Sequence, residues 1–184
     1  MNCSWMLTTA LVLLLGGKEP PPHQMELAVT TQSQDDWVGK PLPDFEVTGL
    51  DGRQYKTSVL KGKQIVMNFW FIACKPCVME MPELNQLVDQ YKSDTTIVFL
   101  APALDAASAV EKFLEQHSFQ YALVPSSRQL VSQVFGIRSY PTHLVTDRNG
   151  IVRYAASGYN PGVDGKGSSV ETLAQAIKKW NKNQ

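Results

Sequence analysis

Two cysteines separated by two residues are the side chains of this chain best suited to chemistry. Cys74 and Cys77 follow a nearly continuous apolar run, residues 64–71, which is typical of a strand buried on both faces. Apolar residues at helical spacing come next, so the pair is expected where a strand turns into a helix. Backbone N–H groups and the helix dipole favour a thiolate there. We therefore expect Cys74 to be a reactive thiolate with an exposed sulfur, and Cys77 to lie deeper on the same helix face.

A redox-active pair that cycles between dithiol and disulfide is the chemistry that this position favours. Half of a zinc site is disfavoured, because no second Cys-x-x-Cys or Cys/His pair completes four ligands. A copper-binding pair that includes His143 stays open as an alternative, and so does a binding domain with a vestigial site. A peroxidase is disfavoured, because residues 68–74 lack the Pro and the Thr or Ser that such a cysteine requires.

The elements that hold this pair are predicted from the spacing of apolar residues. Asp51-Gly52 predicts a small hairpin ahead of the first buried strand. The expected strands of the main sheet are residues 64–71, 96–101, 142–146 and 151–155. The expected helices begin near Cys74, Asp105, Arg128 and Val170. A tight turn joins the last two strands, which makes them antiparallel. This order predicts an α/β protein with a mixed central sheet and helices on both faces.

Composition limits the class of protein. The chain has 184 residues, 43% of them hydrophobic, which allows one globular domain with a sizeable core. It carries 17 basic and 17 acidic side chains, and this balance argues against nucleic acid as a partner. Three cysteines are too few for a disulfide-rich scaffold.

The amino-terminal segment is predicted to export the chain. Residues 1–17 carry no charged side chain and are apolar at their centre, which is typical of a signal peptide or membrane anchor. No Lys or Arg precedes the apolar run, which leaves a buried helix or a misassigned start as alternatives. Residues 18–37 are polar and contain a Pro triplet, so they are predicted to be a flexible linker. Residues 38–184 are the predicted folded domain.

Three motifs in this order give a specific resemblance. Residues 66–82, which contain both cysteines, resemble the active-site segment of the thioredoxin-like TlpA/ResA family. Residues 39–45 and 50–52 resemble the N-terminal hairpin that this family adds, and residues 136–142 resemble its cis-proline loop. The likeness covers about residues 38 to 183. It implies a thioredoxin-like fold, with a mixed central sheet, helices on both faces and an added N-terminal β-hairpin.

The resemblance also implies roles for single residues. Cys74 would attack a substrate disulfide, and Cys77 would resolve the mixed disulfide. Pro141 would be cis and lie against the cysteines, although a plain proline at a strand start is the alternative. Asp105 would accept the proton of Cys77, or else cap the helix that follows it. Glu80 would brace the active-site helix, or else lie on a solvated face.

These expectations combine into a function. We expect an exported thiol-disulfide oxidoreductase, periplasmic or anchored to the inner membrane, which acts as a reductant. Its partners would be protein dithiols or disulfides and a membrane or soluble electron donor, with no nucleic acid. The chain is expected to work as a monomer and without a bound cofactor. A copper-binding assembly module of the same fold is the alternative function.

Overall fold

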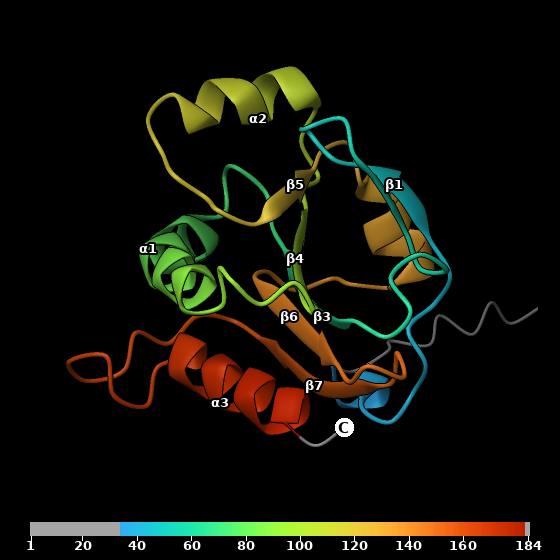
Figure 1. The fold of residues 1–184 in the computed structure, drawn as a ribbon. Helices are drawn as coiled ribbons and strands as arrows, with labels where there is room; N and C mark the ends of the chain where they lie inside the picture. Colours follow the sequence, from blue (N-terminus) through green and yellow to red (C-terminus); the bar gives the residue numbers. More distant parts are fainter. Residues whose placement is uncertain (1–33, 183–184) are drawn as a thin grey trace, which may run out of the picture. The chain divides into compact units, whose positions relative to one another are not determined.

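The computed structural model describes residues 34–182, and a mixed five-stranded sheet lies at their centre (Figure 1). The strand order is β5-β4-β3-β6-β7, in which β3 pairs with β4, and β4 with β5, in parallel. The pairs β3–β6 and β6–β7 are antiparallel. The strands are β3 (Gln64–Phe69), β4 (Ile97–Pro102), β5 (Ala122–Val124), β6 (Thr142–Thr146) and β7 (Val152–Ser157). The predicted mixed sheet is confirmed.

The middle strand β3 is buried along its whole length, as its apolar run predicts. It ends at Phe69 rather than at Phe71, because Trp70 keeps only a single bridge, to Ala103. The backbone then leaves the sheet and reaches Cys74 after four residues. This early exit places the cysteines at the end of the central strand.

Helices α1 (Lys75–Gln90), α2 (Ala107–Leu114) and α3 (Ser169–Lys182) share one apolar core against the sheet. Figure 1 shows α1 and α3 side by side on this face. The buried side chains that they contribute are Met81, Leu84 and Leu87 from α1, Val110 from α2, and Val170, Leu173 and Ile177 from α3. Both cysteines belong to the same cluster. The core therefore fixes the helix that carries the redox pair.

The opposite face of the sheet is covered by shorter elements. These are a 3-10 helix η1 (Gln34–Trp37), the hairpin strands β1 (Glu46–Thr48) and β2 (Gln54–Lys56), and a short π-helix η2 (Leu130–Val134). Phe135 is fully buried there, with its ring 5.0 Å from that of Phe69 and 5.5 Å from that of Trp37. The predicted hairpin, and helices on both faces, are confirmed.

Some elements differ from expectation. Strand β5 was not predicted, and η1 lies in the segment expected to be a linker, where Trp37 is 6% exposed. Helix α2 begins at Ala107, because the backbone carbonyl of Asp105 accepts a hydrogen bond from the Ser126 N–H and its side chain is bonded elsewhere. The expected signal or anchor, 1–17, and the linker up to residue 33 lie outside the described residues. Within 34–182, no helix has the length and apolar character needed to span a membrane.

Candidate redox-active site

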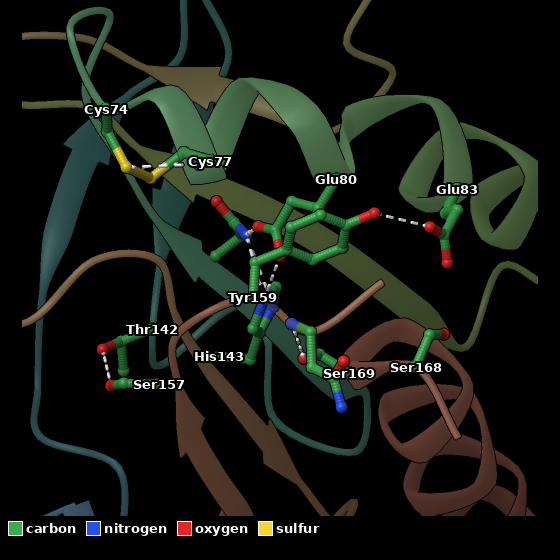
Figure 2. A network of polar contacts seen from close by, with 12 residues as sticks. Cys74, Cys77, Glu80, Glu83, Thr142, His143, Ser157, Tyr159, Ser168 and Ser169 are labelled. Carbon is green, nitrogen blue, oxygen red and sulfur yellow. Dashed lines mark hydrogen bonds and ion pairs between the residues drawn. A yellow bond between two sulfur atoms is a disulfide. The ribbon is translucent and has the colours of Figure 1, made fainter. Parts of the chain in front are cut away.

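Cys74 and Cys77 form a disulfide at the start of α1 (Figure 2). Cys74 is the N-cap residue, with extended backbone, and its sulfur accepts a hydrogen bond of 3.2 Å from the Cys77 N–H. Pro76 lies in the first turn, where its missing N–H costs little. The helix therefore begins on the sulfur of Cys74, as the sequence predicts.

Exposure of the two cysteines is lower than expected. Cys77 is 1% exposed, but Cys74 is also only 5% exposed, so the prediction of an exposed sulfur is wrong. The reason is that Cys74 packs into the apolar cluster beneath α1 instead of standing out from it. Only its neighbours Ala73, Lys75 and Pro76 are exposed.

The segment that precedes Cys74 is held by contacts from distant parts of the chain. The Cys74 N–H donates to the carbonyl of Phe71 at 3.0 Å, and the Phe71 ring meets the Tyr140 ring edge-on at 5.2 Å. The Tyr140–Pro141 peptide bond is cis, as the resemblance implies. The loop that carries Pro141 is thereby tied to the turn that carries the redox pair. That Pro141 lies against the cysteines stays a prediction.

Asp105 also contacts this segment. Its Oδ2 accepts a hydrogen bond of 2.8 Å from the Ile72 N–H. The alternative that Asp105 caps the next helix is wrong, because Ala106 is the N-cap of α2 and no side chain caps it. The carboxylate instead fixes the turn two residues before Cys74. Proton transfer between Asp105 and Cys77 stays a prediction.

Asn68, Glu80 and His143 form a buried polar cluster in the core. Figure 2 shows Glu80 on α1 and His143 below it. Asn68 from β3 donates through Nδ2 to Glu80 Oε1 at 2.7 Å. His143 from β6 places Nε2 at 3.1 Å from Glu80 Oε2. Glu80 and Asn68 are fully buried and His143 is 2% exposed. Because Glu80 is one helical turn after Cys77, the cluster is on the same side of α1 as the redox pair.

Three tyrosines respond to the charge of Glu80. Burial raises the pKa of Tyr121 and of Tyr154, and the charge of Glu80 raises both further. Burial also raises the pKa of Tyr159 to about 12, with help from the hydrogen bond of 2.7 Å that its phenol donates to Glu83 and from the charges of Glu83 and Glu80. The core around the cluster thus combines low polarity with a negative charge.

The sequence analysis singled out Glu80 and His143, but it did not predict that they contact each other. A solvated position for Glu80 is wrong, and His143 is buried with a contact to Glu80. The available signal was the pairing of the strands at 64–71 and 142–146, since in the sheet Asn68 stands opposite His143. Both ring nitrogens of His143 face Asn68 or Glu80, which leaves none directed at the cysteines. Residues 34–182 contain no group of three or more His, Cys, Asp or Glu side chains that could hold a metal ion.

Comparison with protein families gives one match over residues 38–155, to the AhpC/TSA family. The thiol-disulfide oxidoreductase ResA of Bacillus thuringiensis is 33% identical over 115 residues, which are 62% of this chain and 66% of the relative. ResA of Geobacillus kaustophilus is 32% identical over 121 residues, 66% of this chain and 70% of the relative. The chain thus spans just under two thirds of the first relative and slightly more of the second.

The chain is also similar in fold and sequence to a protein of known structure. The crystal structure of a protein described as thiol:disulfide interchange protein DsbE, from Chlorobium tepidum, matches with a TM-score of 0.67 at 28% identity. The match covers 77% of this chain and 96% of that one. The predicted thioredoxin-like fold is confirmed by this likeness.

Proposed function

This chain belongs to the AhpC/TSA family, and from that premise we propose that it reduces disulfides of proteins through Cys74 and Cys77. Its relatives agree with the predicted class, a thiol-disulfide oxidoreductase, and nothing in them supports the copper-binding alternative. The observation that carries the proposal is the Cys74–Cys77 disulfide at the first turn of α1. A dithiol at that place has both the activated sulfur and the partner that a disulfide exchange needs.

The reaction begins with the reduced pair. The Cys74 thiolate, stabilised by the Cys77 N–H and the helix start, attacks one sulfur of a substrate disulfide. The substrate S–S bond breaks, a mixed disulfide forms on Cys74, and the first substrate sulfur leaves and takes a proton from water. Cys77 then loses its proton and attacks Cys74, which expels the second substrate sulfur. Two electrons pass to the substrate, and the Cys74–Cys77 disulfide remains.

Cys77 needs a group that accepts its proton in the second step. Glu80 fits this role because it is buried and follows Cys77 by one turn on the same helix face. Asp105, the carboxylate singled out from sequence, is bonded to the Ile72 N–H, and we retain it as the second candidate. The two carboxylates lie in different surroundings, so separate substitutions distinguish them.

We place this activity outside the cytoplasm, with the chain exported or tethered to the inner membrane. The apolar residues 1–17 support export. A membrane or soluble donor returns electrons to the pair after each cycle. The protein acts as a monomer and needs no bound cofactor, since the two sulfurs carry both electrons.

Substitution of each cysteine tests the proposal. Cys74→Ser should abolish the reduction of insulin disulfides, because it removes the attacking sulfur. Cys77→Ser should trap a mixed disulfide on Cys74, which appears as a thiol-sensitive adduct on a non-reducing gel. Retained turnover in Cys74→Ser excludes the nucleophile that we assign, and the lack of any adduct in Cys77→Ser excludes the resolving role.

A further inference from the structure

His143 is a buried titratable residue for which the exchange reaction assigns no step. It lies in the central part of the sheet at 2% exposure, and its Nε2 is 3.1 Å from Glu80 Oε2. Asn68 Nδ2 is 3.3 Å from the His143 Nδ1 and 3.4 Å from its Nε2. A buried imidazole that contacts the carboxylate one turn after Cys77 is placed to control that carboxylate.

The contacts of the buried polar cluster define which ring nitrogen carries a proton. Glu80 Oε1 already accepts from Asn68, whose Nδ2 also approaches the imidazole. Glu80 Oε2 has His143 Nε2 as its partner, so a proton on Nε2 gives this oxygen a donor. Asn68 Nδ2 is 3.3 Å from Nδ1 and 3.4 Å from Nε2, so the tautomer is assigned from the Glu80 contact alone. With the proton on Nε2, both carboxylate oxygens of Glu80 have a hydrogen-bond donor, while Asn68 Oδ1 is left without a partner.

This arrangement matters because Glu80 is fully buried. A buried carboxylate keeps its charge only when hydrogen bonds to the charged form replace water. The other titratable groups that face Glu80 are Tyr121 ahead of β5, Tyr154 on β7 and Tyr159 on the loop after it, with Glu83 beyond Tyr159. None of these groups is a cation, and Glu83 adds negative charge. Among the described residues, Asn68 and His143 are therefore the hydrogen-bond partners of the two Glu80 carboxylate oxygens.

We propose that His143 is a positioning residue, which holds Glu80 ionised through its Nε2–H and so keeps it ready to take the proton of Cys77. This inference rests on the proposed function and on Glu80 as the proton acceptor. During resolution the proton moves from Cys77 to Glu80, the Cys74–Cys77 bond forms, and the bond from Cys74 to the substrate breaks. Glu80 later returns the proton to water or to Cys77, while His143 gains and loses none.

The experiment measures how fast Cys77 resolves a mixed disulfide at different pH values. Fully reduced protein is mixed with a chromogenic aromatic disulfide, and release of the second coloured thiolate reports resolution. His143→Leu removes the donor and keeps an apolar side chain of similar size. His143→Gln keeps an N–H near the place of Nε2. His117→Gln is the matched control, because His117 is exposed and stacks on Phe113.

Loss of one charge-assisted hydrogen bond should make the carboxyl hold its proton to higher pH. The acid side of the rate profile should therefore move upward by roughly one to two pH units in His143→Leu. His143→Gln and His117→Gln should keep the wild-type profile. An unmoved profile in His143→Leu overturns the inference. An equal shift in His143→Gln also overturns it, because the ring would then act by packing alone.

Two further measurements cover the cases in which His143→Leu does not fold or the wild-type protein resolves no mixed disulfide. If His143→Leu does not fold, the ring nitrogens of His143 in the wild-type protein give the answer by NMR. A neutral ring protonated on Nε2 supports the inference, and a proton on Nδ1 overturns it. If the wild-type protein resolves no mixed disulfide at all, the proposed function fails. If it resolves normally and only the His143 results disagree, this inference fails alone.

Discussion

The start of α1 offers a prediction whose size follows from the structure. Cys74 Sγ accepts the Cys77 N–H at 3.2 Å, and Cys77 is 1% exposed, so water cannot replace this acceptor. The first turn of α1 contains no acidic side chain. Serine at position 74 should cap the helix as well as the sulfur does, whereas alanine leaves a buried N–H without a partner. Cys74→Ala should therefore be less stable than Cys74→Ser by about 1 kcal/mol.

The disulfide adds a second difference in the free energy of unfolding, between the oxidised and the reduced protein. The two cysteines are three positions apart, and closing so small a loop stabilises the folded state by roughly 2 kcal/mol in the chain-entropy model. Oxidised wild type should be the most stable form. Reduced wild type and Cys74→Ser should lie about 2 kcal/mol below it and close to each other. Cys74→Ala should lie lowest.

Urea unfolding, followed by tryptophan fluorescence with and without a reductant, measures these differences. Each variant is compared with reduced wild type at the same pH, so that only the acceptor at residue 74 changes. Equal stabilities of Cys74→Ala and Cys74→Ser would refute the reasoning. The side chain at position 74 would then not stabilise the start of α1. The Cys77 N–H could in that case not be taken to stabilise the Cys74 thiolate either.

Two other predictions concern the carboxylates and the phenol near the site. Glu80→Gln should slow resolution of the mixed disulfide by roughly 10²-fold or more, and Asp105→Asn should not; the reverse result, read in the same thiolate-release assay, would make Asp105 the proton acceptor. Tyr159 keeps its proton up to a pKa of about 12, above the ordinary 10.0, so its contribution to stability is complete below pH 10.0 and is lost as the pH rises through about 12. Tyr159→Phe should remove that alkaline loss from the curve of unfolding free energy against pH, and an unchanged curve would contradict the assignment.

Much of the fold could be predicted because burial leaves a strong pattern. The continuous apolar runs that became β3 and β4 are typical of strands covered on both faces, and a Cys-x-x-Cys pair directly after the first of them indicates the helix start. β5 could not be predicted, because three residues in a mixed environment form no pattern. Trp37 stands in a polar stretch, and only its contact with the Phe135 ring shows that it belongs to the core.

Positions in the candidate site that depend on local spacing could be predicted from the sequence. Positions that depend on tertiary contacts could not. Cys74 and Cys77 are three positions apart, and that distance alone places them on one turn of a helix. Asp105 looked equally suited to capping α2, and its bond to the Ile72 N–H crosses 33 positions of sequence. The meeting of Glu80 with His143 requires the helix phase and the strand register together. A single sequence gives neither of these with the necessary accuracy.

Under the proposed function, the low exposure of Cys74 should favour flexible client proteins over rigid ones. An attacking sulfur must reach bonding distance along the axis of the target disulfide, and here Cys74 is only 5% exposed beside the exposed residues Ala73, Lys75 and Pro76. A rigid, globular client would touch this rim before its cystine came within reach. A loosely folded polypeptide can thread a single bridged loop into the opening. The proposed function thus predicts discrimination by client flexibility, which would follow from the burial of Cys74 and not from a particular amino-acid motif.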